Sequence, residues 1–173
     1  YGTNYGDHRF YARVFELILR LRGNFMWPAM WSWSFYADDP ENSRTARDMG
    51  IIMGTSHHEP MARNHQEWSR KRKEYGAWDY TTNQKVIDQF FREGIKGRKD
   101  TEDLITIGMR GDGDAPMGGK EGADHEYVNR DEYNMNLLEK VIKNQRKIIR
   151  DVTGIPADER PQVWAIYKEV QRF

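Results

Sequence analysis

Three short stretches of the sequence bring together side chains that could take part in chemistry. They contain two adjacent histidines with a glutamate, an arginine with two aspartates, and a glutamate that follows an apolar run. Imidazoles, guanidinium groups and carboxyls are the groups from which acid–base catalysis and anion recognition are built. The stretches are GTSHHEPM at 54–61, MRGDGD at 109–114 and YKEVQ at 167–171.

The histidine stretch permits three interpretations: a metal site, the start of a helix, or one lip of a pocket. An HExxH metal motif needs a second histidine one helical turn after the first, and none stands at that spacing. The nearest, His65, is seven residues after His58 and is expected two turns up a helix, so we predict no metal. Ser56 could cap a helix with Pro60 at an early position, which leaves the histidines incidental. In the third interpretation a substrate is bound by His57, His58 and Glu59.

The MRGDGD stretch resembles a calcium loop but lacks its ligands. An EF-hand loop beginning at Asp112 would need an oxygen ligand at its fifth position, where Pro116 stands. As a glycine-rich turn the stretch suits polar recognition, because Arg110 can bind a carboxylate through two hydrogen bonds and Asp112 and Asp114 offer further polar groups. The alternative is a plain surface turn with a local arginine–aspartate pair.

The YKEVQ stretch places Glu169 just past the apolar run VWAIY. A carboxyl between aromatic neighbours and a rim is desolvated, and desolvation favours its protonated form, so Glu169 is a candidate general acid. Alternatively, Lys168 and Glu169 simply end an exposed strand. A group of aromatic residues could stack on sugar rings or pack in the core: Trp27, Trp31, Trp33, Phe35 and Tyr36.

Composition narrows the class of protein. The chain has 173 residues, enough for one domain or for part of a larger one, and its 13% aromatic content argues against disorder. Lysine plus arginine balance aspartate plus glutamate at 27 each, so a nucleic-acid or anionic-membrane partner is disfavoured. The chain has no cysteine, hence no disulfide framework, and no apolar run long enough to cross a bilayer. It begins at Tyr1 without a signal peptide, and we expect a fragment.

The elements that must position these stretches alternate between helices and short apolar strands. Such alternation, with strands that are continuous apolar runs, predicts an α/β fold with a parallel sheet covered by helices. The absence of a glycine-rich phosphate fingerprint favours part of a (β/α)8 barrel over a doubly wound fold. Helices are expected at 9–22, 40–49, 60–75, 83–96 and 131–153, and strands at 25–27, 51–54, 104–109 and 162–167.

The chemistry-bearing stretches all follow predicted strands, whereas the connections that enter the strands have simple turn sequences. In parallel α/β proteins the carboxyl ends of the strands form the site. The sequence therefore predicts that four strand ends meet at one rim.

Seven segments, in this order, resemble the central region of the glycoside hydrolase family 115 enzymes. The likeness runs through nearly the whole chain, and the combination of HHEPM, MRGDGD and YKEVQ is specific. The segments are NFMWPAMW, DDPEN, GIIMGTSHHEPMARN, GAWDYTTN, ITIGMRGDGD, NQRKII and PQVWAIYKEVQ.

The resemblance implies an α-glucuronidase that removes α-1,2-linked glucuronic acid, or its 4-O-methyl ether, from glucuronoxylan by inversion and without a metal or other cofactor. It implies that Glu169 is the general acid and that His57, Arg110 and Asp114 line the uronate pocket. Glu59 and Asp112 are further candidates, and Asp112 or Asp114 would serve as the base. It also implies an extracellular, multidomain protein that forms a homodimer.

The chain differs from the family in length and not in its motifs. Its four or so predicted strands cannot close a barrel that requires eight. We treat residues 1–173 as a single region of a longer catalytic barrel and expect the segment alone to be inactive. The alternative is a non-catalytic, truncated α/β module with a structural or interaction role.

Overall fold

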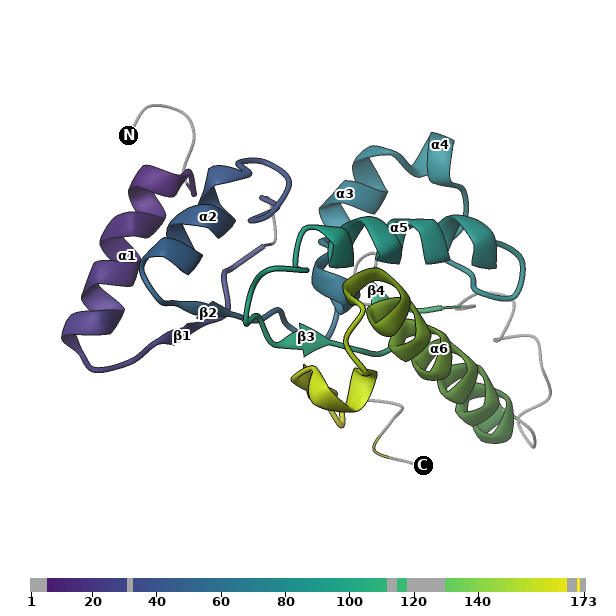
Figure 1. Ribbon diagram of the computed structural model, residues 1–173. Helices are drawn as coiled ribbons and strands as arrows, with labels where there is room; N and C mark the ends of the chain where they lie inside the picture. Colours follow the sequence, from purple (N-terminus) through teal and green to yellow (C-terminus); the bar gives the residue numbers. More distant parts are fainter. Residues whose placement is uncertain (1–5, 31–32, 112–114, 118–129, 168–170, 172–173) are drawn as a thin grey trace.

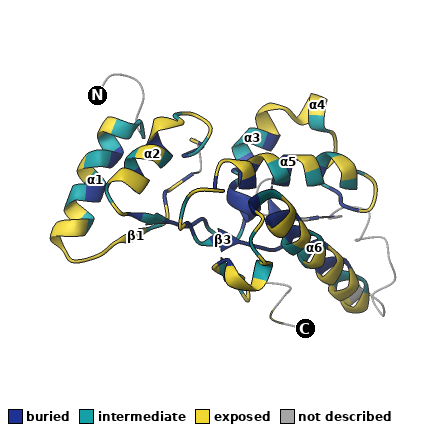
Figure 2. Cartoon of the chain, in the orientation of Figure 1, coloured by how far each residue is buried: buried dark blue, intermediate teal, exposed yellow. Residues whose placement is uncertain are grey.

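Short parallel strands run through the middle of the molecule and helices flank them (Figure 1). The computed structural model describes residues 6–30, 33–111, 115–117, 130–167 and 171. Buried residues gather in β3 and on the inner faces of the helices, while the outer helix faces are exposed (Figure 2). In the described part of the chain no helix combines the length and the apolar character that crossing a membrane requires.

Four of the short strands form two parallel pairs, each a two-stranded sheet. β1 pairs with β2 and β3 pairs with β6, both in parallel, and the Leu104 N–H donates to the Met53 carbonyl (2.9 Å), which links the two pairs. The predicted α/β class with parallel strands is thereby confirmed, and closure into a barrel is not seen among the described residues. The strands are β1 (Phe25–Met26), β2 (Ile52–Met53), β3 (Ile105–Thr106) and β6 (Gln162–Val163).

The MRGDGD stretch begins as a hairpin, which the sequence did not predict. β4 (Arg110–Gly111) pairs in antiparallel fashion with β5 (Ala115–Pro116). The hairpin starts four residues after Thr106, the last residue of β3, so Arg110 lies in a strand and not in an irregular turn.

The N-terminal part of the chain forms one apolar cluster between α1 (His8–Arg20), α2 (Glu41–Asp48) and the first two strands. Asp7 caps the first helix, because its carboxylate accepts a hydrogen bond from the Phe10 N–H (3.0 Å). Stacked and edge-on aromatic contacts join Tyr11, Phe15 and Phe35.

The rest of the chain builds a second, larger apolar cluster under β3. α5 packs along α6, and their inner faces contribute Phe91 and Val141, both fully buried. The elements around it are η1 (Pro60–Ala62), α3 (His65–Arg70), α4 (Arg72–Tyr75), α5 (Gln84–Lys96), α6 (Arg130–Thr153) and η3 (Ala157–Glu159).

The helix predicted at 60–75 was wrong at its start and in its continuity. Met61 and Ala62 have left-handed backbone angles (φ 60° and 56°), so only one 3-10 turn forms after Pro60. The true helix begins at His65, where Asn64 and Glu67 form a reciprocal capping box. Gly94 of α5 permits this turn, since a Cβ there would lie 2.1 Å from the Met61 carbonyl oxygen.

Candidate active site

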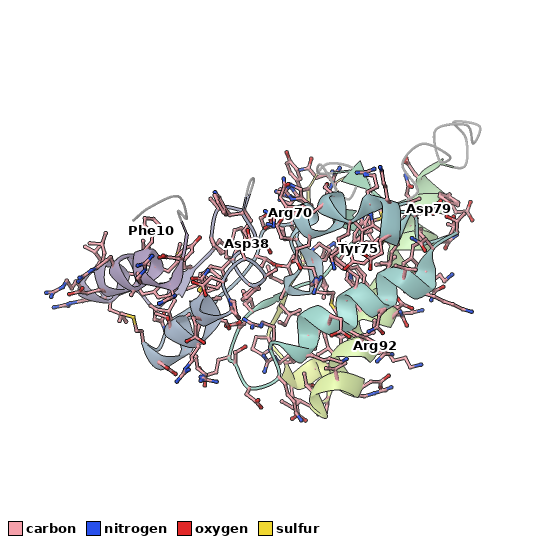
Figure 3. All side chains as sticks on the ribbon, turned by 90° about the horizontal axis from the view of Figure 1, so that it is seen from above. Phe10, Asp38, Arg70, Tyr75, Asp79 and Arg92 are labelled. Atoms are coloured by element: carbon pink, nitrogen blue, oxygen red, sulfur yellow. The ribbon has the colours of Figure 1, made fainter. Side chains whose placement is uncertain are left out.

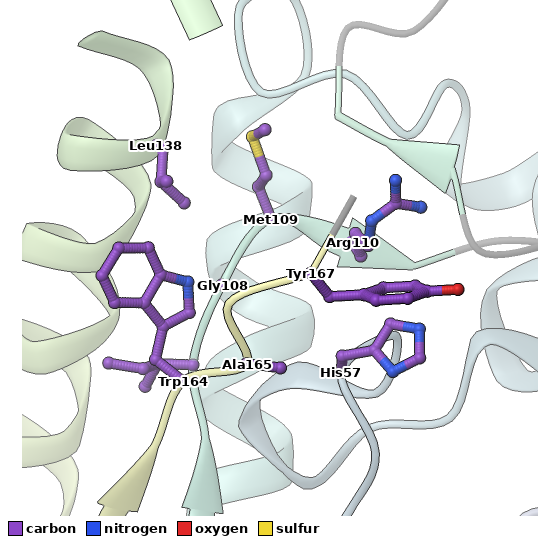
Figure 4. Close-up of a pocket in the computed structure, with 9 residues that line it drawn as sticks. His57, Gly108, Met109, Arg110, Leu138, Trp164, Ala165 and Tyr167 are labelled. Carbon is purple, nitrogen blue, oxygen red and sulfur yellow. The ribbon is translucent and has the colours of Figure 1, made fainter. Parts of the chain in front are cut away.

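A pocket opens where the carboxyl ends of β3 and β6 meet the loop that follows β2. Side chains from four separate parts of the chain face it (Figure 4). Those that shape it are His57, Met109, Arg110, Leu138, Trp164 and Tyr167.

Tyr167 lies between His57 and Arg110 (Figure 4). The His57 and Tyr167 ring centroids are 4.7 Å apart with an interplanar angle of 59°, and the Arg110 guanidinium carbon lies 6.0 Å from the Tyr167 centroid. Arg110 is buried, with 8% of its surface exposed, whereas Tyr167 is 41% exposed. A buried cation thus lies beneath an aromatic face at the rim.

The spacing of these residues after their strands explains why they meet. His57 comes four residues after Met53, Arg110 four after Thr106 and Tyr167 four after Val163, and these are the last residues of β2, β3 and β6. Because the strands are parallel and adjacent, equal spacing puts the three side chains at the same edge of the sheet. The predicted convergence of strand ends is therefore confirmed for these three strands.

A buried glutamine fixes the end of β3. The Gln145 side chain of α6 accepts from the Gly108 N–H (2.9 Å) and donates to the Gly108 carbonyl (2.7 Å). Gly108 has φ 141°, a conformation that other residues rarely adopt. This pair of bonds orients the backbone that leads to Arg110, two residues further on.

His58 and Glu59 lie apart from the described lining of the pocket. Both are buried (7% and 2% exposed), and the Ser56 N–H and hydroxyl donate to the Glu59 carboxylate at 3.2 and 3.0 Å. Burial raises the pKa of Glu59 to about 7, against the opposing effect of the two Ser56 hydrogen bonds. Their assignment as substrate-binding residues stays a prediction.

His65 is not two turns up a helix, as expected, but is the first residue of α3. Its Nδ1 atom lies 3.3 Å from Nδ1 of His58. The left-handed turn at Met61 and Ala62 reverses the chain between the two histidines, which sequence spacing alone does not reveal.

Trp27 is half exposed (48%) and covers Gly54, where a Cβ would lie 2.5 Å from the indole Nε1. It is not among the residues found to line the pocket, so its role as a binding residue also stays a prediction. Glu169, Asp112 and Asp114 lie outside the described residues.

Sequence reasoning missed Tyr167, Trp164, His65 and Gln145. Tyr167 and Trp164 belong to the apolar run VWAIY, and the available signal was that they follow β6 at the rim edge. Gln145 is a polar residue in an otherwise apolar helix face, and its complete burial is the signal that it has a specific partner.

Comparison with known proteins decides the family. The profile described as "Glycosyl hydrolase family 115" matches residues 2–173. The chain belongs to glycosyl hydrolase family 115. No curated protein matches the chain.

A solved family 115 structure has the same fold over this segment. It is BtGH115A, described as a 4-O-methyl-α-glucuronidase with specificity for decorated arabinogalactans. The sequences are 33% identical, the TM-score is 0.82, and the match covers 99% of this chain. This family 115 chain spans 22% of the length of that structure.

Proposed function

We propose that this chain is the uronate-binding segment of a longer family 115 α-glucuronidase. The reaction is hydrolysis of α-1,2-linked glucuronic acid, or its 4-O-methyl ether, from glucuronoxylan. The observation that carries the proposal is the arrangement of His57, Tyr167 and Arg110 in one pocket at adjacent strand ends.

The chemistry of the pocket suits a sugar acid. The substrate carries a carboxylate, and the planar guanidinium of Arg110 can bind it through two parallel hydrogen bonds. The ring of Tyr167 lies between His57 and Arg110 and holds the two side chains in position, and His57 offers an imidazole donor to a hydroxyl oxygen. Burial of Arg110 lowers the local competition from water, which strengthens its attraction for an anion.

The proposed mechanism is inversion with a pair of carboxyls. Glu169 follows Tyr167 by two residues and would protonate the leaving oxygen, while Asp112 or Asp114, just after Arg110, would activate water. An inverting pair stands about 6.5–9.5 Å apart, which leaves room for that water.

The sequential strand order supports a barrel. We propose that β1, β2, β3 and β6 are four successive strands of a (β/α)8 barrel, whose other strands lie outside residues 1–173. The extracellular location and the homodimer that the family resemblance implied stay proposals of the same kind.

Arabinogalactan is a second candidate substrate, and one observation supports it. BtGH115A, 33% identical over this segment, is described as specific for decorated arabinogalactans. Both polymers can present the same terminal sugar acid to the pocket, so the choice of main chain depends on surfaces outside it.

The experiment uses the complete gene product, meaning the full translation product of the reading frame that encodes this chain. It is incubated with glucuronoxylan and, separately, with uronate-decorated arabinogalactan, and the released acid is followed by NMR. We expect release from glucuronoxylan with the β-anomer formed first, which is inversion of the α-linkage. Release only from arabinogalactan would show that arabinogalactan, and not glucuronoxylan, is the substrate. No release from either would favour the non-catalytic module.

A further inference from the structure

Three buried side chains beneath the pocket direct nitrogen and oxygen atoms at a common point. His58 Nδ1 and His65 Nδ1 are 3.3 Å apart, and each lies 3.9 Å from Glu59 Oε1. All three residues are buried, at 7%, 5% and 2% exposure. We propose that His58, Glu59 and His65 form a binding site for a divalent transition metal of the zinc type.

The Nδ1–Nδ1 distance of 3.3 Å matches the coordination shell of such an ion, and the two 3.9 Å distances to Glu59 Oε1 are slightly longer than that shell requires. Zinc binds imidazole nitrogen and carboxylate oxygen at about 2.0–2.2 Å, so neighbouring ligand atoms in a tetrahedral site stand about 3.3–3.6 Å apart. The point in their plane that is equidistant from the three atoms lies about 2.2 Å from each, slightly longer than a zinc–imidazole bond, so the ligands must move closer together to hold a tetrahedral ion. Small side-chain adjustments are enough to complete the shell, with water in the fourth position.

The ligand types select the class of ion. Two imidazoles and one carboxylate suit zinc and its first-row neighbours, whereas calcium and magnesium prefer sites made of oxygen alone. One negative charge from Glu59 partly neutralises the dication in a buried place.

Further hydrogen bonds hold the ligands in a suitable orientation. The Ser56 N–H and hydroxyl bind Glu59 Oε2, which directs Oε1 toward the histidines. The Gln66 side-chain Nε2 lies 3.0 Å from Nε2 of His65 and holds that ring in place. Metal binding through Nδ1 requires the Gln66 amide to turn, so that its oxygen accepts the Nε2–H proton. The Thr55 hydroxyl donates to the Glu59 carbonyl (2.7 Å) and fixes the backbone at this ligand.

The ion's role is to position His57. The His57 and His58 rings meet edge to face, with centroids 4.9 Å apart, so a fixed His58 supports the pocket residue beside it. The ion also joins the end of β2 to the start of α3 across the left-handed residues Met61 and Ala62. Such residues persist only where surrounding contacts hold them.

The test measures metal content, not activity, so its outcome is separate from that of the proposed function. The complete gene product is stripped with a chelator, dialysed against Zn²⁺ and analysed for bound zinc by elemental analysis. We expect one equivalent that depends on His65: His65→Ala and Glu59→Gln should weaken binding by more than about tenfold. His8→Ala, which removes a histidine from the separate contact with Asp39, should retain the equivalent.

A variant that fails to fold leaves a measurement on the wild type. X-ray absorption of the zinc-loaded protein should show two imidazole nitrogens at about 2.0–2.1 Å, and Co²⁺ in place of Zn²⁺ should give the visible absorption of a tetrahedral site. The proposal is overturned if folded wild-type protein takes up no stoichiometric Zn²⁺ or Co²⁺, or if His65→Ala keeps the full equivalent. In that case the cluster is a hydrogen-bonded group of two histidines and a glutamate.

Discussion

The imidazole of His57 lies against the ring of Tyr167, with 4.7 Å between the centroids, although the two residues follow strands that are far apart in the sequence. Each stands four residues beyond its strand, so the parallel sheet itself brings them to one level. This contact forms one wall of the pocket, and Arg110 lies on the other side of the same ring (Figure 4).

Because the Tyr167 ring forms this wall of the pocket, removal of the ring should lower catalytic efficiency. In the complete gene product, Tyr167→Ala should lower kcat/KM by about tenfold, since an aromatic pair contributes about 0.5–1.5 kcal/mol beyond the area it buries. Tyr167→Phe retains the ring and should lose much less. Equal losses in the two variants would show that the ring contact with His57 is not what matters.

Arg110 predicts selectivity for an acidic sugar. Arg110→Lys should lower kcat/KM by about 10- to 100-fold, because hydrogen bonds to charged groups contribute about 1.5–3 kcal/mol and lysine cannot form the paired bonds. Arg70→Lys, on the exposed surface of α3, is the matched control and should leave the kinetics unchanged.

The substrate carboxylate provides the complementary test. Methyl esterification of the uronate should lower kcat/KM strongly for the wild type. The same esterification should lower kcat/KM only slightly for the Arg110→Lys variant. If the ester and the free acid react equally well in the wild type, Arg110 does not bind the carboxylate.

Gly94 predicts a loss of stability from one added methyl group. A Cβ at this position would lie 2.1 Å from the Met61 carbonyl oxygen, so Gly94→Ala should destabilise the fold by about 1–3 kcal/mol through overpacking. Gly97→Ala, where the nearest atom is 3.5 Å away, is the control at the end of the same helix. Thermal unfolding of both variants measures the difference, and equal melting temperatures would contradict the close approach.

The ion pair between Asp38 and Arg70 joins the N-terminal part of the chain to α3 (Figure 3). Partial burial opposes ionisation of Asp38, but the Arg70 guanidinium and the Ser34 N–H outweigh it and hold its pKa below the ordinary 3.8. A lowered pKa in the folded state means that the pair stabilises the protein above pH 3.8 and that this contribution is lost as the pH falls further.

Asp38→Asn should therefore cost up to about 1 kcal/mol at pH 7, a small value because the pair is partly exposed, and less near pH 3. Unfolding of the complete gene product at both pH values checks this. In an Arg70→Gln background, Asp38→Asn should change the free energy of unfolding little at either pH. If Asp38→Asn in the wild type lowers stability equally at both pH values, the ion pair is not the cause.

The sequence was sufficient to locate the four parallel strands and the end of those strands that carries the chemistry, but not the hairpin of β4 and β5. Apolar runs such as IIM and LITI become β2 and β3, and the residues after them converge as expected. The prediction of a helix from Pro60 was wrong. Two consecutive residues there, Met61 and Ala62, have left-handed backbone angles, which are set by tertiary contacts with α5 and not by local propensity. The capping pair Asn64 and Glu67 was the local signal for the correct helix start.

The same turn explains the incomplete site prediction. Helical spacing was the only test applied to His58 and His65, and the reversed backbone brings their rings together without it. Tyr167 was interpreted only as an aromatic neighbour of Glu169, although its distance from β6 equals that of His57 from β2.

We propose that this chain supplies the uronate pocket and the general acid of an α-glucuronidase. The most direct measurement is the rate at which the complete gene product and its Glu169→Gln variant release uronic acid from glucuronoxylan. We predict turnover by the wild type and a loss of about 10²- to 10⁴-fold in kcat for the variant, with KM little changed, as removal of a general acid requires. Undiminished turnover by Glu169→Gln, or none by the wild type, would contradict the account.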